Sequence, residues 1–402
     1  MQGNYFSLTR VRLRHFKSIA EADVELGQLL LLVGPNGSGK SNFLDSLRLV
    51  SESLQTSLDQ ALRARGGIAE VRRRSQGHPN NLSIQLEFRG PEHHGQYGFT
   101  IATVRGGGYR IRQEYCKVWL KSRDGEGERS ADAFFEVENG GLVGHSEPVM
   151  PPVGEQRLYL VSAAGLTPFR PVFDGLAGIS VFNLNPDVIR QPQTPDSGEF
   201  LLRDGSNLAS VLHRLERTER GRDDKERIEA YLQQIVPGMH TVTRSNLGNW
   251  ETLEFKQDVP GAPHPWRFQA QSVSDGTLRA LGVLVSLFAG TGSTLSTIGI
   301  EEPESALHPA AAGVLLDALR DASERRQVIV TSHSPDLLDR EGFELSEICA
   351  VRSVGGATKI GKLDAAGAMA LREQLYTPGE LLRTDQLLPE LSAEMPPTEM
   401  PR

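Results

Sequence analysis

The sequence predicts an α/β protein in which one large domain combines a mixed central sheet, an antiparallel β subdomain and a helical insertion. The first observation is the apolar run 29–33, which precedes a glycine-rich segment and a helix starting at Lys40. The second is a pair of apolar runs late in the chain, 296–301 and 327–332, both of which lead into polar side chains. The third is period-two alternation before residue 29 and between 81 and 120. Since the early run and its later partners enclose most of the chain, we expect one domain with insertions.

The elements expected between these runs follow from local periodicity. Alternation predicts strands at 5–16, 21–26, 81–89, 97–105 and 109–120, the last three forming a β meander inserted after the first helix. The Gly-, Glu- and Ser-rich stretch 121–155 is expected to be loop, and 207–235 has the spacing and charge of a surface helical pair. The domain should therefore cover 1–387, with insertions at about 56–155 and 205–260, and 388–402 should be a disordered tail.

The composition indicates a soluble, cytoplasmic protein with a substantial core. The 402 residues are 38% hydrophobic, yet no apolar run approaches the roughly 20 residues of a membrane span, and the first ten residues lack the core of a signal peptide. Two cysteines, Cys116 and Cys349, are too few for a disulfide scaffold, so we expect both to be reduced packing residues. The net charge of −8 gives no overall attraction to nucleic acid, and contact with DNA would need a local patch.

The segment between the apolar run 29–33 and the helix at Lys40 has the pattern G-x-x-x-x-G-K-[ST]. Backbone N–H groups of such a turn and of the helix start point at phosphate oxygens, Lys40 adds a charge for the β and γ phosphates, and Ser41 offers a hydroxyl to Mg²⁺. The predicted phosphate-binding residues are Gly34, Pro35, Asn36, Gly37, Ser38, Gly39, Lys40, Ser41 and Asn42. The loop alone does not choose among kinases, GTPases, helicases and ABC-type ATPases.

A second candidate anion site lies at the segment "SVSDGTLRALGVLVSLFAG", residues 272–290. Ser274, Asp275 and Gly276 precede a helix that is apolar on almost every side and must be buried. Its N-terminal amides and the serine hydroxyl suit an anionic ligand. The alternative is a plain N-cap, in which Ser274 or Asp275 caps the helix and Gly276 eases the turn.

The late apolar runs end in side chains suited to nucleotide hydrolysis. In "STIGIEEPESALHP", Glu301 and Glu302 follow a strand that Pro303 stops; the first acid can hold Mg²⁺, and the second can orient or deprotonate the attacking water. In "QVIVTSHSPDLL", a second strand places His333 at the same sheet edge, where it could sense the γ-phosphate. These positions predict ATP and Mg²⁺ as the cofactors.

In order and spacing, these segments resemble an ABC-type ATPase head of the SMC and RecF branch, a P-loop NTPase fold. The resemblance is closer to the AAA "predicted ATPase" group, OLD-like heads that here lack the nuclease domain, and it extends from "FKSI" near residue 16 to "YTPGELLR" near 380. It implies the Walker A loop at Gly34 to Ser41, the signature at Ser274 to Thr277, the Walker B acid at Glu301, the catalytic glutamate at Glu302, the D-loop at Glu304 to His308 and the switch histidine at His333.

The sequence departs from the family pattern at two positions, and one family residue, the Q-loop glutamine, is not assigned. Glu301 replaces the usual aspartate, which lengthens the arm to the metal, and the sequence S-D-G-T in place of the transporter-type signature argues against a membrane-pump subunit. The Q-loop glutamine is not assigned; Gln191 and Gln193 are both candidates. No N-K-x-D motif is present, which argues against a GTPase.

The resemblance implies a slow ATPase whose heads dimerise around ATP, because the signature of one head closes on the nucleotide of the other. The leading hypothesis is the ATPase of a bacterial anti-phage defence or DNA-maintenance complex with a separate effector, since the roughly 70 residues after His333 are too few for a fused nuclease domain. The alternative is a stand-alone RecF-like DNA-binding repair ATPase, for which the basic cluster 63–74 would be the footprint; that cluster can equally be a solvated face.

The insertions are the expected docking surfaces for the effector. In the helical pair 207–235, five apolar positions are expected to pack partly on the core and partly on another protein: Leu208, Val211, Leu212, Ile228 and Leu232. His93 and His94 have no partner acids at ligand spacing, so metal binding there is not expected.

Overall fold

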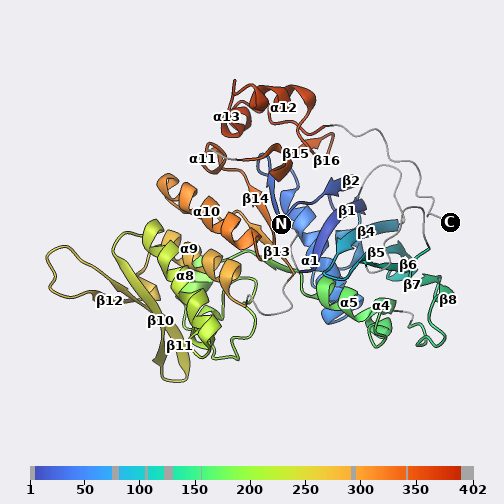
Figure 1. The fold of residues 1–402 in the computed structure, drawn as a ribbon, viewed down its shortest axis with the longest axis horizontal. Coiled ribbons are helices and arrows are strands. Elements are labelled where there is room, and N and C mark those ends of the chain that lie inside the picture. Colours follow the sequence, from blue (N-terminus) through green and yellow to red (C-terminus); the bar gives the residue numbers. More distant parts are fainter. Residues whose placement is uncertain are drawn as a thin grey trace.

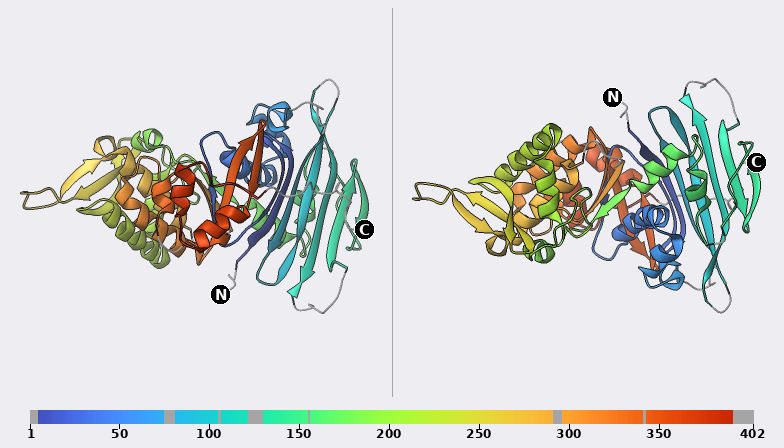
Figure 2. Two further views of the ribbon diagram at one scale, coloured as in Figure 1. Left: turned by 90° about the horizontal axis from the view of Figure 1, so that it is seen from above. Right: turned by 90° about the horizontal axis from the view of Figure 1, so that it is seen from below.

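The fold is organised around a mixed sheet of thirteen strands and a separate sheet of three (Figure 1). The computed structural model describes residues 5–74, 81–104, 107–121, 130–154, 156–290, 296–340 and 343–390. The large sheet has the order β8-β7-β6-β5-β4-β1-β2-β16-β15-β3-β14-β13-β9, and the small sheet the order β10-β11-β12. The small sheet projects from the end of the molecule opposite β4–β8 (Figure 2).

The bounds of the elements are as follows. The strands are β1 (Ser7–Phe16), β2 (Ile19–Glu25), β3 (Leu29–Val33), β4 (Asn81–Arg89), β5 (His93–Thr103), β6 (Tyr109–Leu120), β7 (Ala133–Glu138), β8 (Gly141–His145), β9 (Ser180–Phe182), β10 (Met239–Leu247), β11 (Trp250–Gln257), β12 (Trp266–Gln269), β13 (Thr297–Glu301), β14 (Gln327–Ser332), β15 (Ile348–Val354) and β16 (Ala357–Gly361). The helices are α1 (Lys40–Gln55), α2 (Leu58–Arg63), α3 (Ile68–Val71), α4 (Tyr159–Ala163), α5 (Arg170–Ala177), α6 (Pro186–Arg190), α7 (Leu208–Leu215), α8 (Glu219–Ile235), α9 (Asp275–Phe288), α10 (Ala312–Ser323), α11 (Pro335–Leu338), α12 (Ala365–Arg372) and α13 (Pro378–Arg383).

Five neighbouring strands of the large sheet, β15-β3-β14-β13-β9, run parallel to one another. β3 and β14 are buried along their whole length because helices cover both faces, which explains their continuous apolar sequences. The register pairs Val33 with Ser332 and Glu301 with Thr331. The carboxyl ends of the three strands that carry the predicted motifs therefore meet at one edge.

The predicted antiparallel strands are present, and they continue the main sheet through β1, which pairs with β2 on one side and β4 on the other. β4 and β6 have the predicted bounds, whereas β5 starts four residues early, inside the predicted loop. The prediction of loop across 121–155 was wrong for part of that stretch, because β7 and β8 lie there. Ala133, Phe135 and Val137 alternate inward along β7, a short pattern hidden among glycine and acidic residues. Residues 122–129 and 155 lie outside the described part.

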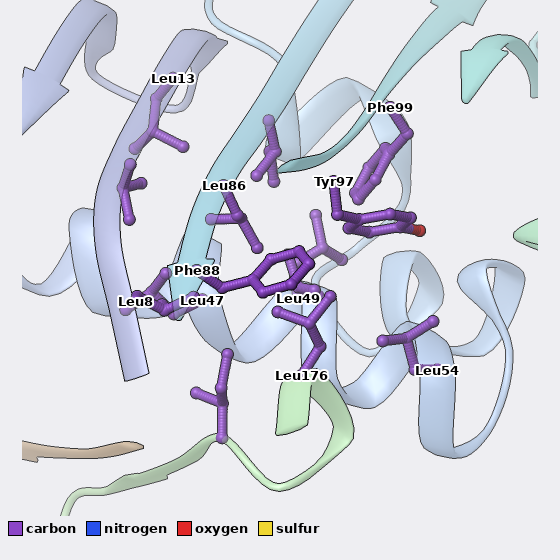
Figure 3. Close-up of a cluster of buried hydrophobic side chains, with 14 of the residues drawn as sticks. Leu8, Leu13, Leu47, Leu49, Leu54, Leu86, Phe88, Tyr97, Phe99 and Leu176 are labelled. Atoms are coloured by element: carbon purple, nitrogen blue, oxygen red, sulfur yellow. The ribbon is translucent and has the colours of Figure 1, made fainter. Parts of the chain in front are cut away.

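The meander and the phosphate-loop helix share one hydrophobic core (Figure 3). Leu47, Leu49 and Leu54 of α1 face Leu86 and Phe88 of β4, together with the buried side chains Leu8, Leu13, Tyr97, Phe99 and Leu176. Burying each large apolar side chain stabilises the fold by about 1.5–3 kcal/mol. Because α1 begins at Lys40, the same packing fixes the loop that precedes it.

A second core surrounds α9, which is buried on nearly every side as its sequence predicts. Helices α8 and α9 lie side by side in it (Figure 1). The expectation that the helical pair would share its apolar face with another protein was wrong, since no more than 3% of any of these residues is exposed: Leu208, Val211, Leu212, Ile228 and Leu232. The many charged residues of α8 suggested an exposed helix. Most of them lie on its solvent side, whereas its apolar side packs on the core of the same chain.

The last two helices of the described residues, α12 and α13, lie above β15 and β16 (Figure 1). Ordered structure extends to Glu390, because its N–H donates to the carbonyl of Lys362 (2.7 Å) and the Leu388 carbonyl accepts from Asp364 (3.0 Å). Residues 388–390 of the predicted tail are therefore bonded to the fold, and the remainder of that prediction, 391–402, lies outside the described residues. Cys116 and Cys349 are buried and unbridged. Across the described residues, no helix has the length and apolar character needed to span a bilayer.

Candidate nucleotide and catalytic site

The glycine-rich loop connects β3 to α1 and holds Lys40 in a buried position. The Lys40 ammonium donates to the carbonyls of Gly34 (2.8 Å) and Pro35 (3.1 Å), so the side chain folds back over its own loop. Burial lowers the pKa of Lys40, and the carboxylates of Glu302 and Glu304 oppose that shift. The Ser38 hydroxyl is also buried in this loop and has no hydrogen-bond partner. A loop with a desolvated cation and an unsatisfied hydroxyl at the start of a helix fits phosphate oxygens.

Glycine is required twice in this loop. Gly39 has φ +104°, and a Cβ there would lie 2.0 Å from Thr358 Oγ1; a Cβ on Gly34 would lie 2.0 Å from the Val351 carbonyl oxygen. β15 and β16 therefore pack directly against the loop. Pro35, Asn36 and Gly37 remain exposed at its tip, as does Ser41 at the start of α1.

A hydroxyl network under the loop was not predicted. Thr358 Oγ1 donates to the Ser38 carbonyl (2.8 Å) and lies 2.6 Å from Ser18 Oγ, which accepts from the side-chain amide of Asn42 (2.6 Å). Asn42 thus braces the loop against β2 and β16. The one sequence signal for this contact was "FKSI", which contains Ser18.

The acidic turn after β13 has an unusual backbone. Glu302 has φ +45°, a left-handed conformation that costs a non-glycine residue about 1–2 kcal/mol. Its N–H donates to the Thr331 carbonyl (3.0 Å). The guanidinium of Arg279, on α9, donates to the carbonyls of Glu301 (2.9 Å), Glu302 (2.9 Å) and Leu184 (2.6 Å). The sequence did not point to Arg279 as a site residue. Its guanidinium nevertheless holds the backbone of the turn that carries Glu301 and Glu302.

Glu302 and His333 come together at the ends of β13 and β14. His333 Nδ1 lies 3.2 Å from Glu302 Oε1 and 4.0 Å from Glu304 Oε1. Glu304 accepts from the Ser332 hydroxyl (2.7 Å) and the His333 N–H (3.3 Å), while its second oxygen is buried without a partner. Burial raises the pKa of Glu304. The sequence suggested a D-loop position for Glu304. In the structure its carboxylate supports the backbone that carries His333.

The candidate metal residues lie on two neighbouring elements, Ser41 at the start of α1 and Glu301 at the end of β13. Glu301 Oε1 accepts from the guanidinium of Arg203 (2.9 Å), a residue that no motif indicated. Within the described ranges, no group of three or more His, Cys, Asp or Glu side chains is placed to hold a metal ion. A hydroxyl and one carboxylate are the small donor set that fits Mg²⁺ bound together with phosphates and water.

The predicted signature residues start α9 and pack beside the acidic turn. Ser274 Oγ accepts from the Thr277 N–H (3.3 Å), so the capping alternative is realised; Asp275 is paired with Arg190. A Cβ on Gly276 would lie 2.5 Å from the Ala306 carbonyl oxygen. Among the described residues, no hydrogen bond or ion pair joins Ser274, Asp275 or Gly276 to the loop at 34–42 of the same chain.

Of the two Q-loop candidates, the structure makes one unsuitable. Gln193 is buried, accepts from the Ala209 N–H (2.9 Å) and donates to the Ile189 carbonyl (3.2 Å), which is a packing role. Gln191 is exposed at the end of α6. Phe182 of β9 pairs with Ile300 of the parallel strand β13. The next residues along the two strands, Asn183 and Glu301, therefore lie beside each other.

The basic cluster 63–74 is largely neutralised within the chain. Arg63 pairs with Asp59 (2.7 Å), Arg74 with Glu70, and Arg65 with both Asp45 (3.0 Å) and Glu52 (2.5 Å). Arg73 donates to the carbonyls of Ser18 (2.5 Å) and Gly356 (3.0 Å). His93 packs against Phe88, and His94 stacks on Trp119. These contacts favour structural roles for the cluster and for both histidines.

Comparisons with known proteins agree with this geometry. No curated protein matches the sequence. Two solved structures share the fold at low identity: an SMC head bound to the C-terminal winged-helix domain of ScpA (TM-score 0.53, 14% identity, 90% of this chain and 99% of that one) and an SMC head with an extended coiled coil bound to the C-terminal domain of ScpA from Pyrococcus furiosus (TM-score 0.50, 12% identity, 92% and 99%).

The likeness to SMC heads confirms the predicted α/β fold of the ABC-type ATPase head, with its large mixed sheet and small antiparallel sheet. The family profile described as "AAA domain, putative AbiEii toxin, Type IV TA system" matches residues 29–148 and 156–339, which include the loop, the acidic turn and His333. That match covers well over half of the sequence, and the chain therefore belongs to this family of P-loop ATPase domains.

Proposed function

We propose that this chain is a slow ATPase switch whose heads dimerise around ATP, and that it powers a bacterial anti-phage defence or DNA-maintenance complex through a separately encoded effector. The observation that carries the proposal is the convergence of Lys40, Glu302 and His333 at one sheet edge, with Nδ1 of the histidine 3.2 Å from the Glu302 carboxylate. The family description mentions a toxin of a toxin–antitoxin system, which supports a role beside an effector.

Each residue has a distinct role in the proposed reaction. The loop amides and Lys40 bind the phosphates, and Mg²⁺ held by Ser41 and Glu301 would neutralise their charge. Glu302 orients the attacking water and accepts its proton. His333 lies beside the Glu302 carboxylate, where it would sense the γ-phosphate of bound ATP. Glu304 acts indirectly, by fixing the backbone N–H of His333.

The same roles predict what a hydrolysis-dead variant should do. Glu302→Gln keeps the shape of the side chain and removes the base, so ATP hydrolysis should fall at least about a hundredfold while ATP binding survives. Light scattering with ATP should show the accumulated dimer. Glu324→Gln, an exposed glutamate just after α10, is the matched control and should behave as wild type. Normal hydrolysis by the Glu302 variant would remove this residue from the mechanism.

The dimer requires a composite site. Among the described residues, the side chains of Ser274 and Asp275 bond only within the helix cap and to Arg190, and both residues are exposed, so this helix start is available to a second copy. A Lys40→Ala chain should not hold ATP, and a Ser274→Arg chain should hold ATP without closing. Mixing the two inactive chains should restore partial ATPase activity through one intact site. If the mixture stays inactive, either the signature of one chain does not act on the nucleotide of the other, or a dimer needs both of its sites intact.

A second candidate function is a stand-alone DNA-binding repair ATPase. The SMC-like fold favours it, but the internal pairing of Arg63, Arg65 and Arg74 leaves the expected footprint with little free charge. Tight DNA binding by the pure chain at physiological salt would establish this alternative over the effector hypothesis.

A further inference from the structure

A cavity of about 590 Å³ opens between α7, α8, α9 and the loop 198–201. Its floor is apolar and comes from three elements: Phe182 of β9, Val211 and Leu215 of α7, and Val285 of α9. All four residues belong to the buried core, so the floor is rigid. Its size lies within the range of about 300–1,000 Å³ that is typical of ligand pockets.

The lining also includes three arginines within seven residues of sequence, Arg214, Arg217 and Arg220, all exposed. Among the described residues, the Arg214 side chain makes no hydrogen bond or ion pair, and Arg217 contacts only His213 Nε2 (3.3 Å). In a chain with a net charge of −8, this is a local concentration of positive charge beside an apolar floor.

In the part of the chain that the structure describes, neither Arg214 nor Arg217 forms an ion pair with an acidic residue of the lining. Asp224 is buried, and its carboxylate interacts with the buried guanidinium of Arg326, whose pKa burial lowers to about 10 against the opposing effect of Asp224. Glu199 is the remaining acid, and it is exposed on the segment 198–201. The cavity therefore suits an occupant that is apolar at one point and negatively charged around it.

We propose that this cavity binds an acidic peptide segment of a protein partner, with an apolar side chain on the floor and carboxylates against Arg214 and Arg217. The inference rests on the proposed effector-coupled function and gives the effector its recognition chemistry. A protein fits better than a nucleic acid strand, because strand binding uses a row of aromatic platforms along a basic groove, whereas Phe200 is the one exposed aromatic residue in this lining.

The cavity is connected to the nucleotide site by one short segment. Gly198 to Leu201 form a wall of the cavity, and two residues later Arg203 pairs with Glu301. The side chain of Asn207 holds this segment in shape, since its amide donates to the Phe200 carbonyl (2.9 Å) and its oxygen accepts from the Leu202 N–H (2.9 Å). Mg²⁺ bound at Glu301 would compete with Arg203 for that carboxylate, and a weakened Arg203–Glu301 pair would loosen the wall.

The test is a selection from a random-peptide phage library on the full-length chain, followed by fluorescence anisotropy of the enriched peptides. We expect acidic peptides with at least one large apolar residue, bound more weakly at high salt. The variant Arg214→Glu/Arg217→Glu should weaken binding at least tenfold, and the milder Arg214→Gln/Arg217→Gln should weaken it less. Arg222→Glu, on the exposed face of α8 outside the cavity, is the matched control and should bind as wild type.

ATP affinity, measured on the same proteins, separates this inference from the proposed function. If the double arginine variants lose peptide binding while their ATP affinity is unchanged, the peptide site is assigned to the cavity. If the wild-type chain binds the peptides but does not bind ATP, the proposed ATPase switch is wrong and the assignment of the cavity is unaffected. Enrichment of basic peptides, no enrichment at all, equal loss in the Arg222 control or preferential binding of single-stranded DNA would each overturn the assignment. A peptide affinity that ignores Mg²⁺-ATP would overturn the connection through Arg203.

Discussion

Replacing Glu114 by glutamine should change how the stability of the protein depends on pH. Glu114 lies on β6, fully buried, and accepts from the N–H groups of Tyr159 (2.6 Å) and Leu160 (2.9 Å) and from the Tyr97 hydroxyl (3.1 Å). These bonds anchor the start of α4 to the sheet and favour the charged carboxylate. Burial outweighs them and raises the pKa of Glu114 from 4.5 to about 7.

The size of the effect follows from that difference. A pKa about 2.5 higher in the folded chain corresponds to about 3 kcal/mol. Because the folded state holds the proton more tightly, this contribution to stability is complete below about pH 4.5 and is lost as the pH rises through 7. A glutamine cannot ionise, and it keeps only one of the two acceptor oxygens, a loss that does not change with pH. The difference in free energy of unfolding between Glu114→Gln and wild type should therefore move in favour of the variant by about 2.5 kcal/mol between pH 5 and 8.

Urea unfolding followed by circular dichroism at several pH values measures this difference. Glu138→Gln, an exposed glutamate on the neighbouring strand β7, is the control and should leave the wild-type pH profile unchanged. Parallel profiles for Glu114→Gln and wild type across pH 5 to 8 would show that Glu114 does not hold a proton in the folded chain, and the reasoning from burial would then be wrong.

The strand-end motifs could be predicted because each is a local signal with a topological consequence. A short apolar run followed by Gly34, Glu301 or His333 identifies a buried parallel strand, and parallel strands deliver their carboxyl ends to one edge. The buried helix α9 could be predicted for a similar reason, since a helix that is apolar all round has no solvent face. In each case the sequence pattern itself specified the environment.

The residues that hold the site in place could not be predicted, because their partners are distant in sequence and lack a motif. Arg203 lies 98 residues before Glu301, Arg279 bonds to backbone carbonyls that any sequence would supply, and Thr358 supports the loop 320 residues after Ser38. Burial of the helical pair was missed for a related reason: an amphipathic stripe such as Leu208–Leu215 predicts that a face is covered, but not whether the same chain covers it.

Three further substitutions test the support around the nucleotide. Lys40→Ala removes the phosphate charge and should abolish ATP binding in a calorimetric titration; unchanged affinity would exclude this loop as the nucleotide site. Arg279→Ala removes donors to three carbonyls and should lower the free energy of unfolding by about 2–4 kcal/mol. A free energy of unfolding within error of wild type would show that the acidic turn keeps its conformation without Arg279. Arg203→Gln removes the cation that pairs with Glu301. The pair is partly exposed, so it stabilises the apo site by no more than about 1 kcal/mol, and the variant should need up to about fivefold less Mg²⁺ for half-maximal ATP binding, measured in the Glu302→Gln background. An increased Mg²⁺ requirement would mean that Arg203 supports the bound nucleotide and does not compete with the metal for Glu301.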